Sequence, residues 1–264
     1  MNLFIKGNYG RIEEGIIKIA HLGKHLKHIG FDLLRLKKGN HIDFKNENVE
    51  TAVVLFKGKF SLIIEGEKFD DIPGRDNVFQ EEASAAYIPL NTKFRIIAKQ
   101  NMEAAICYGK ASKTHKPFII KPQDVRIKEV GKENYFRYVK DIIYDKHQVD
   151  NLKIGETVSF DGNWSSFPPH KHDRDRPPIE SKLEEIFLFR IEPPKGFAVQ
   201  KVYTEERDID ETYTMHDYDS VLIPRGYHPV VGFPGYKILY FWILGGEKRY
   251  WKVFEDENHS WIGK

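Results

Sequence analysis

Short apolar segments recur along the whole chain of 264 residues, and turn-forming residues interrupt them about every ten residues. The segments are rich in Val, Ile, Phe and Tyr, which fit a pleated, half-buried sheet. This spacing predicts an all-β sandwich or barrel. The strands are expected at FDLLRLKKG (31–39), TAVVLFKG (51–58), FSLIIEG (60–66), SAAYIPL (84–90), FRIIAK (94–99), ETVSFDG (156–162), EIFLFRI (185–191), FAVQKVYT (197–204), SVLIPRG (220–226) and YKILYFWIL (236–244).

Few segments have helical periodicity. The segment IEEGIIKIAHLGKHLKHIG (12–30) can be scored as a helix, but its internal glycines and β-branched residues argue against one. RYVKDIIYD (137–145) is the better candidate for a short helix. KGKF (57–60) and EGEKF (65–69) predict turns.

The two halves of the chain share a layout of strands, a glycine turn and an "IP" step, which is YIPLNT at 87–92 and LIPRGY at 222–227. We interpret this as an internal duplication of an all-β unit, with a link near 110–124. The predicted domains are 1–120 and 121–264. The first half lacks paired histidines at matching places, so metal ligands are expected only in the second.

Composition excludes several classes of protein. The 41 basic and 39 acidic residues nearly balance, which argues against a nucleic-acid or membrane-surface binder. The first ten residues, MNLFIKGNYG, contain no apolar signal region, and no apolar run approaches the ~18 residues of a membrane helix. A cytoplasmic protein is therefore expected. The single cysteine, Cys107, lies in an apolar run and predicts a buried, inert thiol.

Histidines and glutamates of the second half form a possible metal site. His170 and His172 are two residues apart, so on a strand both rings point to one face. On its own, this pair also fits a solvated loop, HKHDRDR. The next strand carries Glu184 and Glu185, of which at most one faces inward. His228 follows the later strand, in PRGYHP. Two histidines, a carboxylate and a further histidine suit a divalent metal.

These residues resemble the two metal motifs of the cupins. Gly162, His170, His172, Glu185 and Gly196 correspond to the first motif, and Pro224, Gly226 and His228 to the second. An inserted loop, DRDRPPIESKLE, separates His172 from the glutamate and leaves Glu180, Glu184 and Glu185 as alternatives. Glu185 is preferred because the family's glutamate directly precedes an aromatic strand, here EIFLF.

Longer strings resemble the 5-deoxyglucuronate isomerases of inositol catabolism, which are related to the 4-deoxy-5-ketouronate isomerases of pectin breakdown. The strings are GNWSSFPPHKHD, LEEIFLFRIEPPKGFAVQKVYT, IPRGYHPV, PGYKILYFWILGG and RYWKVFEDENHSW. The resemblance implies a bicupin whose C-terminal half binds the metal through His170, His172, Glu185 and His228. It also implies conversion of 5-deoxy-D-glucuronate to 5-dehydro-2-deoxy-D-gluconate through an enediol. Zinc is the expected metal, with Mn, Fe and Ni as alternatives.

The sequence leaves the other functional residues open. Gln200, Tyr203, Tyr227 and Asp173 are candidates for catalysis, and each also fits an ordinary structural role. A cation is needed for the substrate's carboxylate, and the candidates are Arg174, Arg176 and Arg249. A small sugar acid is the expected partner, and a homo-oligomer is compatible with the sequence. The alternative functions are a cupin Fe(II) oxygenase and a non-enzymatic sugar-binding bicupin.

Overall fold

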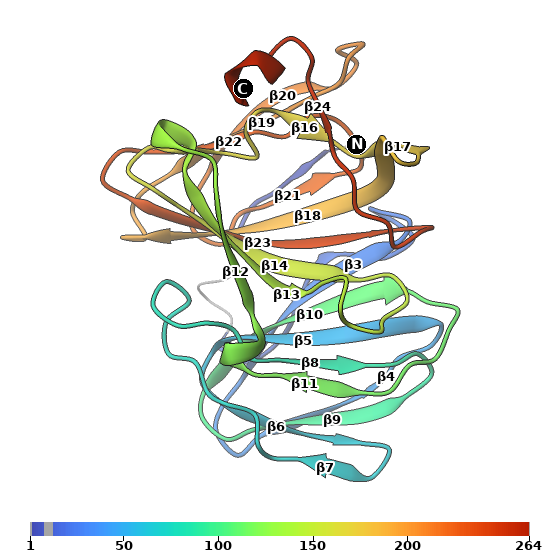
Figure 1. Ribbon diagram of the computed structural model, residues 1–264. Helices are drawn as coiled ribbons and strands as arrows, with labels where there is room; N and C mark the ends of the chain where they lie inside the picture. Colours follow the sequence, from blue (N-terminus) through green and yellow to red (C-terminus); the bar gives the residue numbers. More distant parts are fainter. Residues whose placement is uncertain (1, 8–12, 264) are drawn as a thin grey trace. The chain divides into compact units, whose positions relative to one another are not determined.

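The computed structural model describes residues 2–7 and 13–263, and strands dominate these residues (Figure 1). They contain no α-helix; the helical segments are short 3₁₀ turns at Pro122–Asp124, Glu133–Tyr135 and Ser260–Gly263. None of these turns is long and apolar enough to cross a membrane. The all-β prediction is confirmed, and each of the ten predicted segments overlaps a strand.

The chain divides into two compact units, each built from segments that are separate in sequence. Among the described residues, the N-terminal unit comprises 13–126 and 142–153, and the C-terminal unit comprises 2–7, 127–141 and 154–263. The units thus interleave along the chain, whereas the sequence suggests one boundary between residues 120 and 121.

The N-terminal unit contains a six-stranded sheet of order β11-β8-β5-β10-β3-β2 and a four-stranded sheet of order β4-β9-β6-β7. Alternate residues of both sheets, such as Leu34, Val53, Phe60 and Ile96, share one apolar core. The strands are β2 (Gly15–Ala20), β3 (Ile29–Leu36), β4 (His41–Lys45), β5 (Val49–Lys57), β6 (Phe60–Ile64), β7 (Glu67–Phe69), β8 (Ala85–Ile88), β9 (Lys93–Ala98), β10 (Met102–Lys110) and β11 (Phe118–Ile120).

The C-terminal unit is organised around a sheet of order β1-β21-β18-β23-β14-β13-β12, with β17 paired to β18. Smaller sheets of order β15-β22-β19-β20 and β16-β24 accompany it. The strands are β1 (Phe4–Ile5), β12 (Arg126–Val130), β13 (Arg137–Ile143), β14 (Lys153–Phe160), β15 (Trp164–Ser165), β16 (His170–Lys171), β17 (Asp173–Arg176), β18 (Glu180–Glu192), β19 (Ala198–Tyr203), β20 (Asp210–Met215), β21 (Ser220–Ile223), β22 (Val230–Gly232), β23 (Lys237–Gly246) and β24 (Phe254–Glu255).

Strand β18 is the central strand of this unit. It pairs with β21 on one side and with β23 on the other, and its middle residues, including Phe187 and Phe189, are buried. The phenylalanines join a core with Val202 and Val230 from the smaller sheet. A carboxylate on this strand, Glu185, is therefore carried into the interior of the unit.

The predicted short helix at 137–145 is wrong. Arg137–Ile143 is strand β13 of the large sheet. Its β-branched residues Val139, Ile142 and Ile143 favour a strand, and pairing within the sheet outweighs the weak helical pattern. The segment 12–30 contains β2 and the start of β3, in agreement with the argument against a helix there.

The extreme N-terminal segment belongs to the C-terminal unit. Strand β1 pairs with β21, with Phe4 opposite Val221, and the carbonyl of Leu3 accepts a hydrogen bond from the amide of Leu222 at 2.8 Å. The buried carboxylate of Asp219 accepts the amide of Gly7 at 2.7 Å. These bonds complete the edge of the sheet that carries Glu185 on β18.

The predicted turn at KGKF contains a glycine that its backbone requires. Gly58 has φ +88°, and a Cβ atom there would lie 2.2 Å from the carbonyl oxygen of Asn101.

Cys107 is fully buried, and burial raises the pKa of its thiol well above the usual value. The prediction of a buried, inert thiol is confirmed.

Candidate metal centre

Three side chains from separate segments of the C-terminal unit meet in its interior. His172 follows β16, Glu185 lies on β18, and His228 lies between β21 and β22. The Nε2 atoms of His172 and His228 are 3.1 and 3.2 Å from the same atom, Oε2 of Glu185. All three residues are buried, and their possible ligand atoms lie within 4.8 Å of one another. Nitrogen and oxygen donors therefore converge on one point.

Backbone carbonyls set the tautomers of the two histidines. Nδ1 of His172 is 2.8 Å from the carbonyl oxygen of Leu183, and Nδ1 of His228 is 2.8 Å from that of Gly226. A carbonyl oxygen only accepts, so each Nδ1 carries the hydrogen and donates it. In the neutral rings, both Nε2 lone pairs then face the Glu185 carboxylate.

This arrangement lacks a positive charge between its donors. Nε2 of His228 is buried and has no hydrogen-bond partner among the residues that the structure describes. Three electron-pair donors facing one another are stable only around a cation. Backbone carbonyls that accept a hydrogen bond from Nδ1 are also usual partners of metal-bound histidines. The donor set fits a divalent transition metal.

Burial and the mutual interaction of Glu185 with the histidines act in opposite directions on the pKa values of these donors. Burial alone would raise the pKa of Glu185, but the adjacent His172 and His228 lower it to about 2. Burial likewise opposes protonation of His172, but its hydrogen bond to Glu185 and the charge of that carboxylate outweigh burial and raise the pKa.

His170, the fourth predicted ligand, lies beside this group. Its ring centroid is 5.0 Å from that of His228, and the two rings are nearly perpendicular. Burial and the charges of His228 and His172 hold the pKa of His170 well below its usual value. The ring is therefore neutral, which is the form that binds metals. The structure brings three of the four predicted ligands together and places the fourth ring next to them.

The geometry separates the three glutamates that the sequence left as alternatives. Glu180 is buried with Lys171, whose Nζ donates to it at 2.8 Å, and its other oxygen accepts from Arg176 at 2.5 Å. Glu184 precedes Glu185 on β18, so its side chain leaves the opposite face of the strand. Only Glu185 of these three belongs to the described cluster with the histidines.

The four candidates for catalysis all support segments that carry the cluster. Gln200 is fully buried, and its Nε2 donates to the carbonyl of His228 at 3.0 Å. The hydroxyl of Tyr203 donates to Asp256 at 2.7 Å, and burial raises the pKa of this tyrosine. Two further contacts involve Tyr227, which stacks on Tyr203 at 5.0 Å, and Asp173, which accepts the amide of Gly226 at 2.8 Å.

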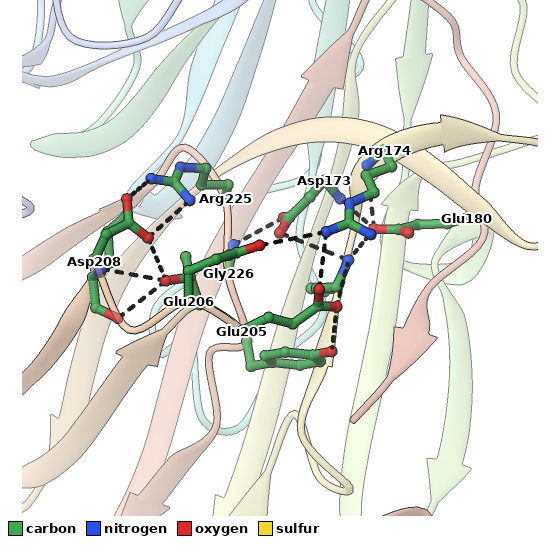
Figure 2. A network of polar contacts seen from close by, with 12 residues as sticks. Asp173, Arg174, Glu180, Glu205, Glu206, Asp208, Arg225 and Gly226 are labelled. Carbon is green, nitrogen blue, oxygen red and sulfur yellow. Dashed lines mark hydrogen bonds and ion pairs between the residues drawn. The ribbon is translucent and has the colours of Figure 1, made fainter. Parts of the chain in front are cut away.

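Two of the three arginines proposed for substrate binding are held in ion pairs. Figure 2 shows Arg174 in a network with Glu205 and Glu180. Nη2 of Arg174 is 2.9 Å from Oε2 of Glu205, and Arg176 pairs with Glu180. Their positive charges are thus already balanced by carboxylates. Arg249 lies in the irregular segment between β23 and β24 and is partly buried.

The C-terminal segment contributes to the site, which the sequence did not predict. Strand β24 pairs with β16, with Glu255 opposite His170. Before β24, the ring of Trp251 lies 5.8 Å from that of His172 and remains 39% exposed. A partly exposed aromatic ring therefore borders the buried cluster. The string RYWKVFEDENHSW, which the resemblance includes, contains the carboxylate-binding candidate Arg249, but nothing in it indicated a place for Trp251 beside His172.

The buried residue Arg137 was also missed, because its segment was read as a helix. It lies on β13 and is 7% exposed. Its positive charge contributes to the lowered pKa of His170, although burial and the neighbouring histidines act more strongly.

The layered β-sheets of this chain have the fold of the cupins. A cupin 2 conserved barrel domain protein from Leptotrichia buccalis matches with a TM-score of 0.51 and 16% identity, over 89% of this chain and 90% of that one. At this identity the match shows the fold alone.

The sequence comparisons define the family. Residues 5–262 match the model of the KduI/IolB family, and the chain belongs to that family. A 5-deoxy-glucuronate isomerase of Geobacillus kaustophilus is 35% identical over 99% of this chain and 96% of its own length. The crystal structure of an IolB-like protein from Salmonella typhimurium LT2 has a TM-score of 0.93 and 31% identity, and covers all of both chains. The resemblance inferred from the sequence is confirmed.

Proposed function

We propose that this chain is an aldose–ketose isomerase that converts 5-deoxy-D-glucuronate to 5-dehydro-2-deoxy-D-gluconate. Relatives that share about a third of its residues over nearly their whole length carry the name 5-deoxy-glucuronate isomerase. The observation that carries the proposal is the convergence of two histidine Nε2 atoms on Oε2 of Glu185, with both Nδ1 atoms held by carbonyls.

In this proposal His170, His172, Glu185 and His228 hold one divalent metal, with zinc preferred over Mn, Fe or Ni. The metal, when bound, supplies a Lewis acid for the oxygens at C1 and C2 of the sugar. The carbonyls of Leu183 and Gly226 keep both histidines in the ligating tautomer. In the residues that the structure describes, this is the one cluster of its kind, so the site is assigned to the C-terminal unit.

The chemistry requires a proton to leave C2 and a proton to reach C1, while the C2 hydroxyl loses its hydrogen and the aldehyde oxygen gains one. The chain's own contribution is a buried set of side chains that fixes the sugar's oxygens. The partly exposed ring of Trp251 borders this set and gives an apolar surface for the C–H groups of the substrate. Restricting water around the enediol protects it from side reactions.

The first expected result is isomerisation with solvent exchange. Zinc-loaded protein incubated with 5-deoxy-D-glucuronate in D₂O should consume the aldehyde and place deuterium on the former aldehyde carbon, as followed by NMR. A proton carried by a base shared with water exchanges, whereas a hydride does not. Oxygen consumption by the iron-loaded protein would instead indicate an oxygenase. Sugar binding without turnover would indicate a non-enzymatic bicupin.

A second expected result concerns Tyr203, whose hydroxyl donates a hydrogen bond to the buried Asp256. Tyr203→Phe should lower the free energy of unfolding by about 1–2 kcal/mol, because it removes the donor to a buried carboxylate. It should change kcat by less than about threefold. Urea unfolding and steady-state kinetics measure both. A much larger loss of kcat at unchanged stability would place Tyr203 in the proton path.

A further inference from the structure

Arg137 is a buried cation without a carboxylate partner. Only Nη1 of its guanidinium is used in hydrogen bonds, to the carbonyls of Tyr135 at 2.9 Å and Phe167 at 3.0 Å. Among the residues that the structure describes, no Asp or Glu forms an ion pair with it. Burying a guanidinium without a counter-charge is costly, and burial lowers the pKa of this arginine. Such a cation is expected where an anion binds.

The position of Arg137 connects it to the metal cluster. The carbonyl that it contacts, on Phe167, precedes His170 by three residues. The guanidinium is therefore bound to the segment that leads into β16, which begins at His170.

Polar groups lie between the arginine and the cluster. The hydroxyl of Tyr240, which interacts electrostatically with Arg137, is 2.5 Å from the hydroxyl of Ser165. The ring of Tyr240 is 4.5 Å from that of Phe187, and Phe187 is 5.8 Å from His228. Hydroxyl groups and an aromatic wall thus extend from the histidines toward Arg137.

We propose that Arg137 binds the carboxylate of the substrate while the opposite, aldehyde end lies at the His–Glu cluster. This inference rests on the proposed function, because it assumes a sugar acid. A guanidinium presents Nε and Nη2 in a fork that matches a carboxylate, and these two nitrogens make no bond to another described residue. Arg174 and Arg176, in contrast, already face Glu205 and Glu180.

Substrate charge provides the test. For wild-type protein, we compare kcat/KM for 5-deoxy-D-glucuronate with that for 5-deoxy-D-glucose, in which an alcohol replaces the carboxylate. Arg137→Gln keeps an amide donor for the two carbonyls but removes the charge. It should lower the acid-to-alcohol selectivity about 100-fold, because it removes a buried charged hydrogen-bond partner. Arg137→Lys, which keeps the charge without the fork, should lower it less.

Competing arginines serve as controls. Arg174→Gln and Arg249→Gln should preserve the selectivity, and bound metal and the circular dichroism spectrum should be unchanged in every variant. Selectivity that survives in Arg137→Gln, or that collapses in Arg174→Gln or Arg249→Gln, overturns the inference. If wild-type protein turns over neither compound, the proposed function fails, which is a separate result.

A crystal structure of the wild-type protein tests the same inference without relying on the folding of a variant. The ligand is 5-deoxy-D-glucuronate reduced to the alcohol at C1, which cannot isomerise. Its carboxylate should lie within about 3.2 Å of the Arg137 guanidinium. A carboxylate found on another cation, or turned toward solvent, overturns the assignment even if the protein is the proposed isomerase.

Discussion

Glu185→Gln is expected to release the metal from the C-terminal unit and to lower turnover about 1000-fold. The side chain is 4% exposed, and its Oε2 is the atom on which both histidine Nε2 atoms converge. An amide removes the negative charge that balances the ion, and its NH₂ group cannot ligate. The metal content, measured by elemental analysis after gel filtration, should fall from about one metal per chain to a small fraction of that.

Glu184→Gln is the matched control for this experiment. It makes the same chemical change one residue earlier on β18, on the opposite face of the strand. The variant should retain the metal and most of the activity. If Glu184→Gln loses the metal and Glu185→Gln keeps it, the assignment of the inward face is wrong. If both keep it, the cluster is not the metal site.

The inward face of β18 shows how much the sequence could establish by itself. Alternation limits the choice to one of two adjacent glutamates but does not say which, because β18 is buried on both faces through Phe187, Leu188 and Phe189. The resemblance to cupins supplied the choice of Glu185. The structure supports it with two distances to one carboxylate oxygen.

Strands were predictable because their apolar runs are bounded by turn residues, but their partners were not. The segment containing Phe4 and Ile5 is too short to show periodicity, and its pairing with β21 depends on residues more than 200 positions away. Arg137 was missed for a related reason. A charged residue at the start of a segment that fits either a helix or a strand is expected to be exposed. Its burial becomes evident only once the sheet that covers it is known.

Glu50→Ala should give the largest loss of stability, about 3–5 kcal/mol in the free energy of unfolding of the N-terminal unit. Glu50 is fully buried, and its oxygens accept four hydrogen bonds. Oε1 accepts the amides of Asn151 and Leu152, both at 2.6 Å, and Oε2 accepts the amide of Asp150 and the hydroxyl of Tyr87, both at 2.8 Å. Alanine removes the carboxylate that accepts from all four donors, three of which belong to buried residues.

Tyr87→Phe provides the scale for that loss. It removes one of the four donors, while the three amides still donate to the carboxylate. The free energy of unfolding should therefore fall by about 1 kcal/mol. Urea unfolding, followed by far-UV circular dichroism, measures the free energy of unfolding of both variants under the same conditions. Equal losses in the two variants would show that the amides of 150–152 find other acceptors. The segment 150–152 would then not depend on Glu50 for its place beside β5.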